Sequence, residues 1–72
     1  MKKATVVTGI RKDVTPRAVN LIVTTAFATF LILTASAHDQ DVIEASFKLN
    51  KQIEIVATEI EGTYLATEVH FA

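Results

Sequence analysis

The sequence contains no cysteine, which excludes both a disulfide framework and a thiolate nucleophile. Histidine is almost as scarce: His38 and His70 lie near opposite ends of the second half of the chain, which argues against a metal site. Internal repeats and low-complexity linkers are also absent. With 72 residues, the chain is long enough for one domain only, residues 1–72. A domain this small buries little surface, so association into a homo-oligomer remains an open alternative.

Positive and negative charge are separated along the chain. Residues 1–17 carry five Lys and Arg against one Asp, whereas residues 38–72 carry two Lys against seven acidic residues. The formal net charge is therefore only −1. A chain so close to neutrality has no strong overall field that would draw it to nucleic acid.

Residues 18–37 form a run of twenty residues without a charge, which must be buried in a bilayer or in protein. A helix of about 20 apolar residues just spans a hydrocarbon core of roughly 30 Å. The basic flank before the run would leave the N-terminus in the cytoplasm. Six of the twenty positions are polar, however, so insertion would be marginal. A single-span protein of the inner or plasma membrane is therefore the alternative to a soluble domain.

The same run has the periodicity of a helix that packs on a sheet. Its apolar residues recur at helical spacing, at Val19, Ile22, Val23, Ala26, Phe27 and Phe30. Thr15 and Pro16 precede them as an N-cap and a first helical residue. We therefore expect a helix from Pro16 to Ala26 or Thr29. A strand, Phe30–Ala37, would follow it directly, because the residues become β-branched and small, although no Gly, Asn or Pro marks a turn near Ala28.

The remaining segments favour strands. We expect a first strand over Ala4–Thr8, ended by Gly9 and followed by a charged connection over residues 10–14. After a polar break at residues 38–41, apolar and polar residues alternate from Ile43 to Asn50, which favours a strand. A capping box of Asp41 and Glu44 supports a short helix there instead.

The C-terminal third contains the most β-like segment of the chain. It is Ile53–Ile60, which follows a turn at residues 50–52 and ends at Glu61 and Gly62. The tail, residues 63–72, suits a strand or the first turns of a helix. These elements together predict a small α+β domain of β-α-β-β-β order with a C-terminal strand or short helix, and with the long helix packed on one face of the sheet.

Three stretches carry a resemblance to a known family: VTGIRKDVTPRAVNLIV (residues 7–23), LILTASAHDQD (31–41) and VIEASFKLNKQIEIVATEIEGTYLATEV (42–69). They resemble the ribosome hibernation promoting factors, also called sigma-54 modulation proteins. The resemblance implies a β-α-β-β-β-α fold that binds the small ribosomal subunit between head and body, blocks messenger and transfer RNA, and stores ribosomes in inactive form. If residues 41–50 are helical, the order β-α-β-α-β-β is similar to that of the Alba nucleic-acid-binding proteins.

Cations gather around the start of the predicted helix. Arg11, Lys12 and Arg17 are unfavourable near a helix N-terminus, so local stability does not explain them, whereas an anionic partner such as RNA phosphate does. Solubility, or the basic flank of a membrane span, explains them equally well. The full set of candidate RNA-binding residues is Lys2, Lys3, Arg11, Lys12, Arg17, Lys48 and Lys51.

No group of residues indicates catalysis. Glu54, Glu59, Glu61 and Glu68 fit the solvated face of strands, and no nucleophile or base lies at a telling spacing from them. We therefore expect a non-enzymatic, cytoplasmic, ribosome- or RNA-associated factor in translation regulation, without metal or cofactor, whose partner is the small ribosomal subunit or its rRNA. The alternatives are the membrane protein, with a helix at about residues 18–37, and a small oligomeric interaction domain without RNA binding.

Overall fold

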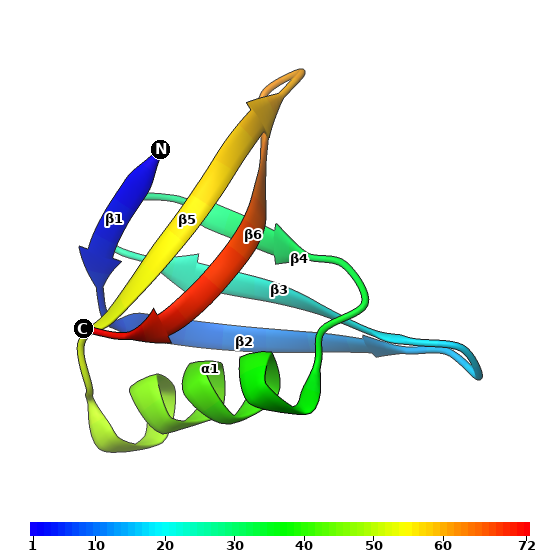
Figure 1. Ribbon diagram of the computed structural model, residues 1–72, viewed down its shortest axis with the longest axis horizontal. Helices are drawn as coiled ribbons and strands as arrows, with labels where there is room; N and C mark the ends of the chain where they lie inside the picture. The colour runs from blue at the N-terminus through cyan, green and yellow to red at the C-terminus, as the bar shows by residue number, and fades with distance from the viewer.

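Six strands and one helix build the protein in a computed structural model that describes residues 1–72 (Figure 1). The strands are β1 (Lys2–Thr5), β2 (Val7–Val14), β3 (Val19–Thr25), β4 (Thr29–Ile32), β5 (Ile53–Ile60) and β6 (Thr63–Phe71). The helix, α1 (Ala37–Leu49), lies between β4 and β5 in the sequence. The protein is therefore a small, mostly β domain with one helix against a mixed sheet.

The sheet closes on itself through its first two strands. Its order is β1-β5-β6-β4-β3-β2, so β1 and β2 are the two ends of the order. Only Val6 separates these two strands, and they behave as one bent strand whose first half pairs with β5 and whose second half pairs with β3. All pairings are antiparallel except that of β4 with β6. The hairpins β2–β3 and β5–β6 project from the body (Figure 1).

The inward side chains of the closed sheet form the core. Alternate residues of the strands point inward because successive side chains of a strand face opposite sides. Helix α1 adds Val42 and Ile43 and packs against β2, β5 and β6 at one end of the sheet (Figure 1). The core residues are Val7, Leu21, Val23, Phe30, Ile32, Val42, Ile43, Ile53, Ile55, Ala57 and Val69.

The predicted strand at residues 43–50 is wrong, because this segment belongs to α1. Helical spacing buries Val42, Ile43 and Ser46, and these contacts outweigh the alternation of the sequence. The helix begins with a capping box of Ser36 and Asp39, not with the pair that the sequence suggested. Each of these two side chains accepts a hydrogen bond from the backbone amide of the other residue, at 3.0 and 3.1 Å.

The predicted helix over Pro16–Thr29 is also wrong. Its residues form a turn, strand β3, a second turn and the first residue of β4. The Thr15 hydroxyl accepts hydrogen bonds from the amides of Arg17 and Ala18, at 3.3 and 3.1 Å. These are the bonds expected of an N-cap, but here they close the β2–β3 hairpin.

The second turn repeats the first. The Thr25 hydroxyl accepts from the amides of Phe27 and Ala28, both at 3.2 Å, and donates to the carbonyl of Ala28 at 3.0 Å. Thr15 donates in the same way to Ala18, at 3.2 Å. The segments TPRA and TAFA are therefore equivalent threonine turns, and the second turn needs no Gly, Asn or Pro.

The predicted strand boundaries are wrong in the first half of the chain and right in the C-terminal third. Strand β2 runs through Gly9 to Val14, so the predicted end at Gly9 and the connection after it are wrong. The predicted strand Phe30–Ala37 is too long, because strand β4 ends at Ile32. The predicted strand Ile53–Ile60 is confirmed, and the tail forms strand β6.

The predicted fold class is confirmed only in its coarse form. The protein combines one helix with a sheet, but the orders β-α-β-β-β and β-α-β-α-β-β are both wrong because no helix precedes β4. The one helix, α1, is too short and too polar to reach across a lipid bilayer.

Candidate functional site: an outward groove beside β4 and β6

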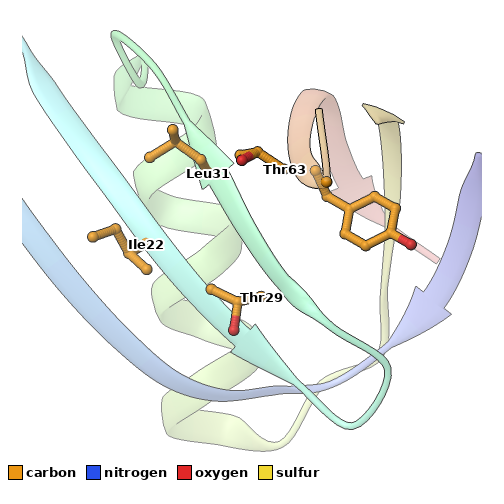
Figure 2. Close-up of a pocket in the computed structure, with 6 residues that line it drawn as sticks. Ile22, Thr29, Leu31 and Thr63 are labelled. Atoms are coloured by element: carbon orange, nitrogen blue, oxygen red, sulfur yellow. The ribbon is translucent and has the colours of Figure 1, made fainter. Parts of the chain in front are cut away.

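A groove of about 330 Å³ opens on the outer face of the sheet. Its lining comes from β3, β4 and the start of β6, as Figure 2 shows. Strands β4 and β6 pair only at Phe30–Tyr64 and Leu31–Leu65. The lining residues are Ile22, Thr29, Leu31, Gly62, Thr63 and Tyr64.

The floor of the groove follows one row of paired residues. Ile22 lies opposite Leu31, and Arg11 lies opposite Ile22. Directly paired residues of neighbouring strands point to the same face, so Arg11 extends this row onto β2. Two strand spacings separate Arg11 from Leu31, which is roughly 10 Å. A cation on β2 therefore adjoins the aliphatic floor of the groove, just outside its lining.

Tyr64 and the turn before it form the side of the groove at β6. The Tyr64 ring packs on the buried Phe30, with ring centroids 5.8 Å apart and planes tilted by 48°. Before it, Glu61 and Gly62 both have positive φ, 51° and 81°. Two successive positive φ values are typical of a type I′ hairpin turn, whose twist matches that of the strands.

Five of the seven predicted RNA-binding cations already have a structural interaction. Lys12 forms a 2.7 Å ion pair with Glu44, and Lys2 lies 3.6 Å from Glu54. Lys3 and Lys51 lie over the rings of Phe27 and Phe71, at 4.8 and 5.4 Å from the ring centres. Lys48 lies in the last turn of α1, where a cation is favourable.

Arg11 and Arg17 are the two that have neither an ion pair, nor a cation–π contact, nor a position at a helix end. Both are exposed and both belong to the β2–β3 hairpin. Arg17 lies at the tip of this hairpin, five residues from Ile22, or roughly 16 Å along an extended strand. The structure therefore disperses the seven predicted cations, and of these two only Arg11 lies next to a residue of the groove lining.

Two glutamates are held as carboxylates by their neighbours. The Lys12 ammonium donates a hydrogen bond to Glu44 and lowers the pKa of that carboxyl, with a smaller effect from Lys48. A 2.7 Å hydrogen bond with His70, helped by the charge of Lys2, lowers the pKa of Glu54. Glu44 and Glu54 thus belong to surface ion pairs. Glu59, Glu61 and Glu68 are exposed, as the sequence predicted.

Sequence reasoning missed the groove itself. Ile22 belongs to the lining, yet its helical spacing from Val19 and Ala26 placed it in the predicted helical stripe. In the strand that forms, Ile22 is an apolar residue on the outer face. The only sequence feature that could have indicated the groove is an apolar residue at an outward position of a strand.

No protein-family model matches the chain, and comparisons with curated proteins and with solved structures found no match.

Proposed function

We propose that the protein is a non-enzymatic RNA-binding protein that holds a single-stranded segment across the outer face of β3 and β4. The strand connectivity supports this. The order of elements corresponds to the OB fold. The bent strand β1–β2 comes first, followed by β3, β4, the helix and the hairpin β5–β6, and β4 runs parallel to β6. Proteins of that fold bind oligonucleotides or oligosaccharides on the face that corresponds to β3 and β4. This correspondence is one of fold, so the choice of ligand depends on the side chains.

The placement of Arg11 is the observation that carries the proposal. Its guanidinium group belongs to the same face as Ile22 and Leu31 and has no carboxylate partner. An unpaired arginine beside an apolar floor matches the chemistry of single-stranded RNA, which offers phosphate to the cation and a base to the floor. Arg17 supplies a second phosphate contact at the hairpin tip.

Six of the eight acidic residues lie on α1, β5 or β6, whereas Asp13 shares the outer face of β2 with Arg11 and Glu61 precedes Gly62 of the groove lining. Glu44 and Asp41 occupy α1, and Glu54 and Glu68 occupy the β5–β6 ladder. These carboxylates repel phosphate, so binding depends on local charge and not on the net charge of −1. The small ribosomal subunit, which the sequence resemblance implies, is the source of RNA that we propose, and the cytoplasm is the corresponding location.

Two neighbouring residues of β2 provide the test. Fluorescence anisotropy with an RNA of about twelve nucleotides measures affinity across a series of salt concentrations. Arg11→Gln should weaken binding about tenfold and reduce the slope of log K against log salt by about 0.7. Lys12→Gln is the matched control, because Lys12 pairs with Glu44 on the helix side. Equal losses in the two variants, or no RNA binding by the unmodified chain, would refute the proposal.

Exposed apolar side chains support a second proposal, that the chain is an oligomeric interaction domain. Val14, Phe27, Leu33 and Leu49 are each more than half exposed. Large exposed apolar residues are more typical of interaction surfaces than of isolated domains. Light scattering coupled to size-exclusion chromatography measures the oligomeric state. A monomer at all concentrations would contradict this second proposal.

A further inference from the structure

Two threonine hydroxyls at the groove differ from the threonines that support the fold. The hydroxyls of Thr5, Thr8, Thr15, Thr25 and Thr67 each donate a hydrogen bond to a backbone carbonyl. Thr29 and Thr63 line the groove, and their side chains form no hydrogen bond within the protein. Figure 2 shows both of them at the same groove as Ile22 and Leu31. Their hydroxyls are therefore available to a ligand.

The size and the walls of the groove suit one nucleoside. Its volume of about 330 Å³ lies at the lower end of the range of about 300–1,000 Å³ that is usual for small-molecule sites. Ile22, Leu31 and Tyr64 offer apolar and aromatic surface against which a base can pack. The hydroxyls of Thr29 and Thr63 are the only side-chain polar groups of the lining besides the phenol of Tyr64.

The surrounding charges determine which part of a nucleotide faces these hydroxyls. Arg11 marks the β2 side of the groove, with Asp13 two residues farther along the same face, whereas Glu61 adjoins Gly62 at the opposite margin. Phosphate is attracted to the first side and repelled by the second. A bound strand thus keeps its phosphates near Arg11 and turns base and sugar toward β4 and β6.

We infer that the groove is a nucleoside subsite in which Thr29 and Thr63 recognise the ribose 2′-hydroxyl, so that the protein prefers RNA to DNA. This inference rests on the proposed RNA-binding function. A threonine hydroxyl and a 2′-hydroxyl can each donate and accept a hydrogen bond, so they are complementary. A deoxyribose would leave the threonine hydroxyls unpaired once the ligand had displaced water from them.

Affinities for RNA and DNA of one sequence test the inference. An oligonucleotide of A and C only keeps the bases identical in the two strands. The unmodified chain should bind the RNA about tenfold more tightly than the DNA, a ratio typical of one or two hydrogen bonds. Thr29→Val and Thr63→Val remove the hydroxyl but keep the branched shape that suits a strand. Each variant should lose RNA affinity and keep DNA affinity, and the double variant should bind both strands equally.

Thr58→Val is the matched control. Thr58 is an exposed threonine of β5 that makes no side-chain hydrogen bond and lies outside the groove lining. Its variant should keep the full RNA preference. Equal binding of RNA and DNA by the unmodified chain would overturn the inference, and so would a preference that survives in the double variant. Both results leave the Arg11-dependent binding intact, whereas a chain that binds neither strand would refute the proposed function itself.

Discussion

The hydroxyl of Ser46 in α1 accepts a hydrogen bond of 2.9 Å from the backbone amide of Val7. The same hydroxyl donates a 2.7 Å hydrogen bond to the carbonyl of Lys51, and the Ser46 side chain is fully buried. Val7 is the first residue after the bend between β1 and β2, where the sheet changes pairing partner. One side chain therefore ties the C-terminal part of the helix to the bend that closes the sheet.

Ser46→Ala should destabilise the protein by about 2 kcal/mol. The variant leaves the buried amide of Val7 without a partner, which costs about 1–3 kcal/mol, and it also removes the part-buried hydrogen bond to the carbonyl of Lys51. Because the domain is small, the melting temperature should fall by roughly 8–16 °C. Thermal and denaturant unfolding measure both quantities. Thr58→Val, which removes an exposed hydroxyl, should change the unfolding free energy by less than about 0.5 kcal/mol, and an equally small effect of Ser46→Ala would contradict the structure.

Thr24 and Thr25 offer an adjacent pair that tests the threonine turn. Thr25→Val removes the hydroxyl that accepts from Phe27 and Ala28, and it should cost about 1–2 kcal/mol of unfolding free energy. Thr25→Ser keeps the hydroxyl and should retain most of the stability. Thr24→Val is the control, because the Thr24 side chain makes no hydrogen bond. If Thr24→Val and Thr25→Val had equal effects in chemical denaturation, the hydroxyl would not define the turn.

The ion pair of Lys12 and Glu44 should give the protein a pH-dependent stability. The folded pKa of Glu44 is lowered, so the pair contributes stability above the unfolded pKa of the carboxyl and loses it as pH falls through the folded pKa. Lys12→Gln should return the Glu44 pKa toward its ordinary value and flatten the acid limb of the stability curve. An NMR titration of the Glu44 side-chain carboxyl measures this directly. An unchanged titration in Lys12→Gln would show that the pair does not form in solution.

Tyr64 should contribute stacking to the binding of RNA. Tyr64→Phe keeps the ring on Phe30 and should bind as the unmodified chain does. Tyr64→Leu removes the aromatic face and should cost about 1–3 kcal/mol of binding free energy, the usual range for a stacked base. Calorimetric titration with the same oligonucleotide measures the difference, after unfolding curves confirm that both variants fold. Equal affinities of the Phe and Leu variants would exclude stacking on this residue.

The second half of the sheet was predictable because its signals are local. The β-branched residues of Ile53–Ile60 and the Glu61–Gly62 turn after them gave the right strand and the right end. The pattern of the tail, residues 63–72, suits both a strand and the start of a helix. The tail becomes β6 because it pairs along the whole of β5, a contact that the tail's own pattern does not specify.

The first half was mispredicted where two patterns fit the same residues. Leu21 and Val23 follow strand alternation, but the outward Ile22 between them completes a helical stripe. This segment forms a strand and not a helix because β3 pairs with β2 on one side and with β4 on the other. Ile22, the residue that fits both patterns, also lines the groove.

The candidate site was predictable only in part. Arg11 and Arg17 were among the expected cations, but the sequence could not show that Lys12 faces α1 while Arg11 lies on the outer face beside Ile22. That difference depends on which residue of β2 pairs with which residue of β3. Thr29 and Thr63 gave no signal, because strands that are distant in the sequence bring them together.

Chemical-shift mapping tests the central claim most directly. A titration of isotope-labelled protein with a single-stranded RNA of A and C should shift the backbone amides of Ile22, Leu31 and residues 62–64 most strongly. The amide of Arg11 should move with them, and α1 should remain unchanged. Shifts confined to α1 or to the acidic β5–β6 ladder, or no shifts at all, would contradict RNA binding at the groove.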